Sequence, residues 1–396
     1  MSIDVWGSAL VLCRKWLLLT AAICLAACGN SSAPIAGNPG AGGGIDKLVC
    51  AHLTLPAVQG VGSAIDGPPP AYDWQAGWQS CEVIFTSKLH GSQLYGVLFA
   101  PENLDLENDK LPAIVIAPGS VTGVQAQYHW SARELAANRY IVLAVDPQGV
   151  GRSELVGQPQ TADNYVDALA SALDFLLSSD NPMQANVDAE HMGVAGHSLS
   201  ARAVSWIQGE DTRIKAIVAW DNLSSTLAGD AGIASGGGAG GALIGGEVPG
   251  GDPRPVKQRV PAMGQASDAP GGTTQDTDPE VKKTGYSTWR TAGISAMQIV
   301  FQGKGHADWG QAPTASADSA SDKSKELQLF QHYTRAWFDL WLKNDRSAIK
   351  ALTTAQVFEH TTATIYSVDF LSALFLPDAG IDCPDIVTGN CSAFAP

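Results

Sequence analysis

Ser198 is the residue in this sequence best placed to act as a nucleophile. It lies in the run Gly196-His197-Ser198-Leu199-Ser200, between the apolar residues 192–195 and a helix-like run over 201–207. A serine on a sharp turn from strand to helix projects its hydroxyl above the sheet, and the turn needs small neighbours because the chain folds back on itself. Gly196 meets that need. Ser200 stands where this motif normally has glycine, but it is small enough for the turn to close.

A nucleophilic serine needs a general base and an acid that orients the base. His306 lies between glycines directly after the apolar run 297–301, whereas His332 falls in a helical pattern and His360 lies near the C-terminus. His306 is therefore the predicted base. Two acids follow strand-like runs, Asp268 after 260–265 and Asp221 after 217–220. As a structural residue, Asp221 would cap the strand exit together with its neighbour Asn222.

An acyl-transfer site also needs two backbone N–H groups that stabilise the oxyanion. One comes from the residue after the nucleophile, Leu199, and the other from the loop after an early strand. The segment Pro118-Gly119-Ser120 follows the apolar run 113–117. We therefore expect the N–H groups of Ser120 and Leu199 to form the oxyanion hole.

The elements around these residues alternate between strand and helix patterns. Continuous apolar runs over 113–117 and 141–145 indicate strands buried on both faces, and helical spacing follows each of them. Further strands are expected at 83–85, 94–99, 191–195, 214–220, 260–265 and 297–301, and helices at 131–138, 165–177 and 327–342. This alternation predicts an α/β fold with a mostly parallel central sheet and helices on both faces. The carboxyl ends of its parallel strands share one edge, where the site must lie.

The turn Asp146-Pro147-Gln148-Gly149-Val150-Gly151-Arg152-Ser153 completes a motif order that resembles the α/β-hydrolase superfamily over about residues 80–345. Within it, the chain is similar to exported bacterial serine hydrolases of the dienelactone-hydrolase and cutinase-like group. The resemblance implies a Ser198, Asp268 and His306 triad, because most members carry the acid after the later strand. Asp221 is the alternative acid. Serine in place of the cysteine of dienelactone hydrolases argues against that particular reaction.

The expected function is hydrolysis of small or polymeric carboxylic esters through an acyl-enzyme, without a cofactor. Two alternatives stay open: a non-catalytic binding protein on the same scaffold, and a peptidase or acyltransferase using the same triad. The glycines of residues 236–241 match a dinucleotide-binding pattern only by composition, since no strand precedes them. The sequence does not distinguish ester from thioester or amide substrates, and it does not predict an oligomeric state.

The N-terminus has the pattern of an export signal. Arg14 and Lys15 precede an apolar run over 16–27 that is too short to span a bilayer. It ends in Leu25-Ala26-Ala27-Cys28, which resembles a bacterial lipobox. We expect residues 1–27 to be a lipoprotein signal peptide and Cys28 to carry the lipid. The mature protein would then be anchored to the cell envelope, at the outer membrane in a Gram-negative host.

The chain after Cys28 divides into a linker and one folded domain. Residues 28–47 are rich in Gly, Ala and Ser and are expected to form a flexible tether, followed by the domain over 48–396. A Gly-rich insertion over about 223–259 is expected to border the substrate entrance. Net charge is −15, with Lys+Arg 24 against Asp+Glu 39. Nucleic acid is therefore an unfavourable partner.

Four of the seven cysteines lie beyond the expected signal peptide and lipidation site. An even number in an exported chain suggests disulfides. Cys383 and Cys391 bracket a short loop and are expected to pair, which leaves Cys50 to pair with Cys81. A metal site is the rival interpretation, but no Cys-x-x-Cys or His-rich spacing supports it.

Overall fold

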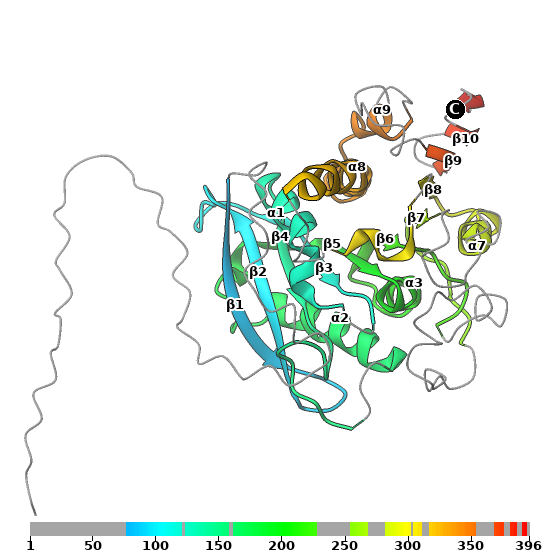
Figure 1. Ribbon diagram of the computed structural model, residues 1–396. Helices are drawn as coiled ribbons and strands as arrows, with labels where there is room; N and C mark the ends of the chain where they lie inside the picture. Colours follow the sequence, from blue (N-terminus) through cyan, green and yellow to red (C-terminus); the bar gives the residue numbers. More distant parts are fainter. Residues whose placement is uncertain are drawn as a thin grey trace, which may run out of the picture. The chain divides into compact units, whose positions relative to one another are not determined.

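The computed structural model describes a mostly parallel sheet between layers of helices (Figure 1). All described residues belong to the compact unit Ile45–Pro396. They are 77–120, 123–157, 161–227, 254–267, 282–301, 304–310, 317–353, 368–375, 381–385 and 390–393. The expected signal peptide, Cys28 and the tether lie outside these ranges, so the predicted domain boundaries stay predictions.

The strands of the described chain form one sheet in the order β1-β2-β4-β3-β5-β6-β7-β8-β9-β10-β11. From β4 to β8 all neighbours are parallel, and the strands at both ends of the sheet are antiparallel. This confirms the expected fold class. The bounds are β1 (Trp78–Thr86), β2 (Gln93–Pro101), β3 (Leu111–Ala117), β4 (Ile141–Val145), β5 (Val187–His197), β6 (Ile214–Trp220), β7 (Ala262–Ser267), β8 (Ala296–Phe301), β9 (Val368–Phe375), β10 (Ile381–Asp385) and β11 (Asn390–Ala393).

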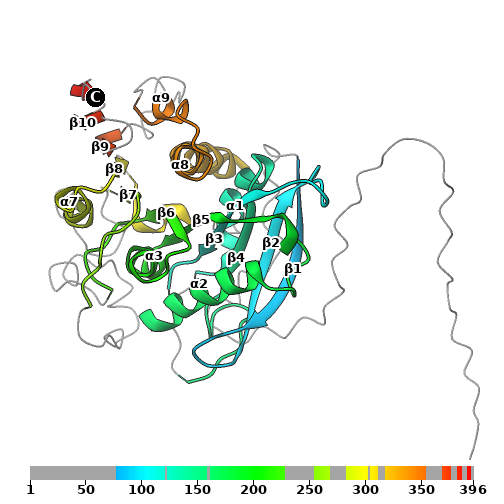
Figure 2. The ribbon, with the colours of Figure 1, turned by 180° about the vertical axis from the view of Figure 1, so that it is seen from behind.

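Helices cover both faces of the parallel strands (Figures 1 and 2). One layer contains α1 (His129–Ala137), α8 (Ala317–Leu342) and α9 (Ala348–Thr353). The other contains α2 (Ala162–Leu177), α3 (Leu199–Glu210) and α7 (Thr284–Thr291). The core accordingly has two apolar clusters, one between each layer and the sheet.

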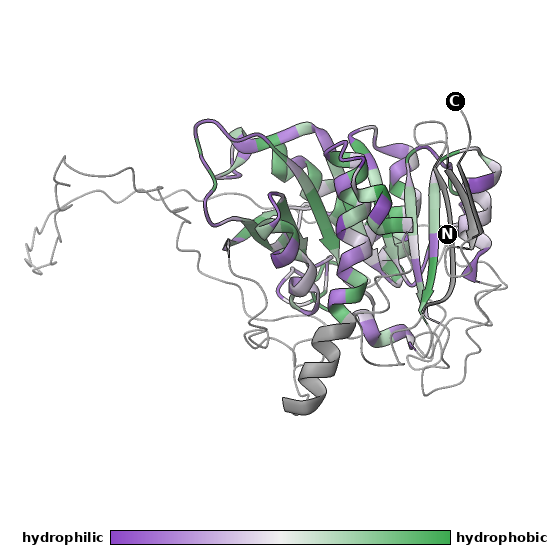
Figure 3. Ribbon diagram, turned by 90° about the horizontal axis from the view of Figure 1, so that it is seen from above, coloured by the Kyte–Doolittle hydropathy of each residue, from purple (hydrophilic) through white to green (hydrophobic). Residues whose placement is uncertain are grey.

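The sequence pattern of the strands follows from this arrangement. Every residue of β3 and β4 is buried, as expected for parallel strands covered on both faces, whereas β1 at the edge alternates buried and exposed positions. Hydrophobic residues accordingly concentrate on the central strands, and hydrophilic residues appear along the outer helix surfaces (Figure 3). The apolar runs of the sequence therefore located the centre of the sheet correctly.

The turn after β4, over residues 146–153, depends on its two glycines. Gly149 and Gly151 adopt φ of 70° and 52°, which glycine tolerates far better than other residues. A Cβ on Gly151 would lie 2.2 Å from a carboxylate oxygen of the buried Asp146. That carboxylate accepts a hydrogen bond from the N–H of Gln125 at 2.7 Å, which ties the turn to the segment after β3.

Several elements were not expected from the sequence. They are helix α7 and the antiparallel strands β9 to β11, of which β9 pairs with β8. The ends of the Gly-rich insertion meet in a bridge between Thr226 and Pro255, but residues 228–253 lie outside the described ranges. The predicted place of that insertion at the substrate entrance is therefore untested.

The described residues contain neither a candidate membrane span nor a candidate metal site. None of the described helices has the length and apolar character needed to cross a membrane. Within the same residues, His, Cys, Asp and Glu side chains do not gather into a group that could hold a metal ion. Cys81 is disulfide-bonded. Its expected partner Cys50 lies outside the described ranges, and the side chains of Cys383 and Cys391 are not described, so both pairings stay predictions.

Candidate active site

Ser198 occupies a strained turn between β5 and α3. Its φ of 55° and ψ of −113° lie outside the usual regions for a residue with a side chain. Its N–H donates to the carbonyl of Trp220 at 3.0 Å, which fixes the turn against β6. A Cβ on Gly196 would lie 2.6 Å from the Cβ of Ser200, so the position requires glycine. The predicted strand-turn-helix geometry is therefore present.

His306 reaches Ser198 from the loop after β8. Its Nε2 lies 2.9 Å from Ser198 Oγ and can accept the hydroxyl proton. The short helix His306–Trp309 that carries it is held by Trp309, which is fully buried. Trp309 Nε1 donates to Gln265 Oε1 at 3.0 Å, and its carbonyl accepts from Trp130 Nε1 at 3.0 Å. The buried Trp309 therefore holds in place the short helix that carries His306.

Asp221, directly after β6, is the acid that contacts His306. Its Oδ2 accepts from His306 Nδ1 at 2.5 Å, and its side chain is fully buried. This contact favours Asp221, the alternative acid, over the expected Asp268, because the imidazole has one Nδ1–H and donates it to Asp221. The catalytic role of Asp221 stays a prediction. Strand β6 lies directly beside β5, so its exit is adjacent to the nucleophile turn. Asp268 itself lies outside the described residues.

The Asp221 carboxylate has further partners that the sequence analysis did not find. Its Oδ1 accepts from the N–H of Ser267 at 3.0 Å and from Lys282 Nζ at 2.6 Å. Ser267 Oγ lies 3.1 Å from both carboxylate oxygens. Burial alone would raise the pKa of Asp221, but the positive charge of Lys282 and the hydrogen bond from His306 outweigh it and hold the pKa well below its usual range. These two partners therefore favour the ionised form of the Asp221 carboxyl group.

A second network joins His197 to the loops on both sides of Ser198. Tyr128 Oη donates to His197 Nδ1 at 2.7 Å, and His197 Nε2–H donates to the carbonyl of His306 at 2.7 Å. Burial lowers the pKa of His197 to about 3, so its imidazole is neutral with the proton on Nε2. Tyr128 in turn accepts from the N–H of Gly119 at 3.2 Å. The network connects the loop after β3 with the loop that carries the base.

The loop after β3 passes close to the nucleophile. A Cβ on Gly119 would lie 3.3 Å from Ser198 Cβ and 2.8 Å from His197 Nδ1. Ser200, the departure from the usual motif, is fully buried and donates from Oγ to the carbonyl of Pro118 at 2.5 Å. Leu199 begins α3, and Ser120 follows Gly119 on this loop. Both predicted oxyanion donors thus lie on segments next to Ser198, while their role stays a prediction.

Local sequence did not reveal Lys282, Tyr128 or His197 as parts of the site. Lys282 contacts Asp221 across 61 positions of the chain, and Tyr128 contacts His197 across 69. Only His197 carried a signal, since it lies inside the nucleophile motif. The contacts of Lys282 and Tyr128 could not be inferred from the sequence, because they depend on which strands end side by side in the sheet.

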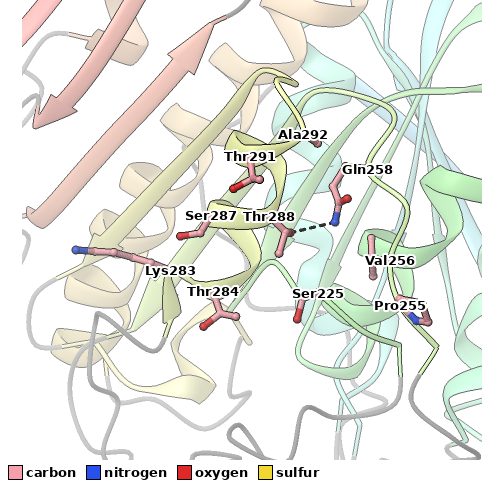
Figure 4. A pocket seen from close by; sticks show the side chains of 10 residues that line it. All are labelled: Ser225, Pro255, Val256, Gln258, Lys283, Thr284, Ser287, Thr288, Thr291 and Ala292. Atoms are coloured by element: carbon pink, nitrogen blue, oxygen red, sulfur yellow. Dashed lines mark hydrogen bonds between the residues drawn. The ribbon is translucent and has the colours of Figure 1, made fainter.

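A shallow groove lies beside α7 (Figure 4). Its volume is about 770 Å³, and hydroxyl groups are prominent in its lining. Gln258 Nε2 donates to Thr288 Oγ1 at 3.0 Å across it. The lining residues are Ser225, Pro255, Val256, Gln258, Lys283, Thr284, Ser287, Thr288, Thr291 and Ala292. Ser198, His306 and Asp221 are not among them.

Comparison with known proteins finds similarity to hydrolases. Residues 82–227 match the model of the PETase family, described as PET hydrolase-like. The fold is that of the α/β-hydrolases. The match includes Ser198 and Asp221 but ends before His306. It covers fewer than half of the 396 residues.

A curated relative of this chain is Thiohydrolase apmlB of Arthrinium phaeospermum, 35% identical over 113 residues. The aligned part is 28% of this chain and 34% of the relative, so the chain spans about a third of the length of the protein it matches. Both comparisons are with hydrolases.

Proposed function

We propose that this protein is a serine hydrolase that cleaves carboxylic esters through an acyl-enzyme. The observation that carries the proposal is the continuous hydrogen-bonded chain from Asp221 through His306 to Ser198, with contacts of 2.5 and 2.9 Å. Nucleophile, base and orienting acid lie within hydrogen-bonding distance in the arrangement that activates a serine hydroxyl. The PET hydrolase-like match over 82–227 supports an ester as substrate.

The reaction follows from the positions of the three side chains. Ser198 Oγ attacks the ester carbonyl carbon while His306 Nε2 takes the hydroxyl proton. Negative charge on the carbonyl oxygen is stabilised by the N–H groups of Leu199 and Ser120. The C–O bond to the alcohol then breaks, and His306 gives its proton to the departing alkoxide. His306 then takes a proton from a water molecule as the water oxygen attacks the acyl carbon. When the bond from the acyl carbon to Ser198 Oγ breaks, His306 returns that proton to Oγ and the carboxylic acid leaves.

A thioester is the second candidate substrate. The same triad would release a thiol in place of an alcohol, and the relative from Arthrinium phaeospermum is named a thiohydrolase. The aligned part of that relative covers only 34% of its length, so it supports the chemistry less directly than the geometry does.

A matched substrate panel tests the proposal. Phenyl acetate and S-phenyl thioacetate share an acyl group, and p-nitrophenyl esters from acetate to decanoate vary its length. We expect burst kinetics and turnover of oxygen esters, with p-nitroacetanilide as the amide control turned over far more slowly. Preference for the thioester would favour the second candidate. A folded protein that hydrolyses neither class and does not react with a fluorophosphonate would support a non-catalytic binding protein instead.

We also propose that Cys28 carries a lipid and that residues 28–47 tether the enzyme to the cell envelope, with residues 1–27 removed as the signal peptide. The support is the Leu25-Ala26-Ala27-Cys28 sequence after an apolar run. In cells expressing the full chain, Cys28→Ser should move the protein out of the membrane fraction or stop its processing. Cys24→Ser is the matched control and should change neither. Unchanged size and fractionation of Cys28→Ser would reject the anchor.

A further inference from the structure

Lys282 makes an ion pair with the acid of the proposed triad. Its Nζ lies 2.6 Å from Asp221 Oδ1 and 3.2 Å from Ser267 Oγ. The Lys282 side chain is 15% exposed and that of Asp221 is fully buried, so water screens the pair weakly. Lys282 lies two residues before the first residue of α7, which packs on β7 and β8. The serine, histidine and aspartate of the proposed function do not by themselves require a cation here.

The resting enzyme needs a partner for the buried carboxylate. His306 is neutral when it acts as a base, so it supplies a hydrogen bond to Asp221 but no full positive charge. A buried charge without an opposite charge is strongly unfavourable. Lys282 supplies that charge on Oδ1, while His306 occupies Oδ2. The two partners bind opposite oxygens of one carboxylate.

Protonation of His306 places two cations on the same carboxylate. Like charges at such short range repel, so the Lys282 ammonium opposes binding of a proton by the imidazole. Among the described residues, His197 also contacts His306; its imidazole is neutral and donates to the His306 carbonyl. Lys304 and Asp308 are the further charged residues on the described part of the His306 loop.

We propose that Lys282 is a positioning residue that fixes the Asp221 carboxylate and extends the activity of the enzyme to lower pH by opposing protonation of His306. The inference rests on the proposed function, because it concerns the acid limb of the same reaction. It predicts a change in pH dependence that loss of a merely structural lysine would not produce.

The first test compares the pH profiles of kcat/KM for a p-nitrophenyl ester. In Lys282→Met and Lys282→Gln the activity should fall off at a higher pH than in the wild type on the acid side of the profile, since the repulsion between the two cations is removed. Lys282→Arg keeps the positive charge, so its pH profile of kcat/KM should match that of the wild type on the acid side. Lys283→Met is the matched control, because Lys283 lines the neighbouring groove and its removal changes the net charge equally (Figure 4).

The second test uses stability and needs no activity. Lys282→Met leaves Asp221 buried with no full positive charge beside it and should lower the apparent Tm by about 10 °C. Adding Asp221→Asn removes the unpaired charge, so the double variant should be more stable than Lys282→Met alone. This coupling also applies if Lys282→Met fails to fold, since the double variant should then recover folding.

The outcomes separate this inference from the proposed function. A wild-type protein that hydrolyses no ester and takes no fluorophosphonate would defeat the proposed function, whatever the stability cycle shows. An active wild type whose acid limb is the same in Lys282→Gln and Lys283→Met would overturn the role of Lys282. So would additive stability effects of Lys282→Met and Asp221→Asn.

Discussion

Ser198→Ala should lower kcat for ester hydrolysis by about 10⁶-fold, as loss of the nucleophile does in other triad enzymes. The hydroxyl at 2.9 Å from His306 Nε2 is the group that forms the acyl-enzyme, and alanine at this position offers no substitute. Substrate binding does not depend on this oxygen, so the affinity for a product or inhibitor should change little. Steady-state kinetics and a fluorophosphonate probe measure both consequences.

Ser200 is the control for this prediction. It lies two residues away, but its hydroxyl is buried and donates to the Pro118 carbonyl. Ser200→Gly restores the usual motif and should still react with the probe. If Ser198→Ala retained labelling that Ser200→Gly abolished, Ser200 would be the nucleophile and the proposed mechanism would be wrong.

Asp221→Asn should lower kcat by about 10⁴-fold, the loss expected when the orienting carboxylate of a triad is removed. The asparagine amide can accept the His306 Nδ1–H only through its oxygen, with its NH₂ group turned away from the imidazole. Because it carries no negative charge, it also cannot stabilise the imidazolium. The same change removes the partner of Lys282. Thermal unfolding should therefore be measured beside kcat to separate lost catalysis from lost folding.

Asp268→Asn is the matched variant, because Asp268 follows the next strand of the sheet and was the acid expected from the sequence. It should retain activity within a few-fold of wild type. Activity that survives Asp221→Asn but not Asp268→Asn would show that the contact between His306 and Asp221 is not the catalytic one.

The nucleophile was predictable because its evidence is local. A glycine, a serine and small neighbours between a strand and a helix specify the turn within five residues, and the structure shows the φ of 55° that such a turn requires. The base was also predictable, since few histidines follow Ser198 and only His306 follows a strand directly. Both inferences needed the sheet only in outline.

The acid was not predictable in the same way. Asp221 and Asp268 each follow a strand, and the choice between them depends on which carboxyl group reaches His306 Nδ1 in space. Strand β6 lies beside β5, and the loop after β8 reaches back over β7 to place His306 against Asp221. A preference taken from similar proteins favoured the later position, and the packing of this chain selected the earlier one.

The contacts that support the three proposed catalytic side chains could not be predicted from the sequence for a related reason. The pairs Lys282 with Asp221 and His197 with Tyr128 join segments that the chain order keeps far apart. Trp309 is buried and holds the His306 loop, but nothing in the sequence distinguishes it from the other aromatic residues. Strand order had to be known before any of these contacts could be inferred.

Trapping the acyl-enzyme tests most directly whether Ser198 is the nucleophile. The protein is mixed with a p-nitrophenyl ester, quenched in acid within the burst, digested and analysed by mass spectrometry. We expect one acyl group per chain on the peptide that contains Ser198, its absence in Ser198→Ala, and its retention in Ser200→Gly. An acyl group on a different residue, or turnover at the full wild-type rate in Ser198→Ala, would contradict it.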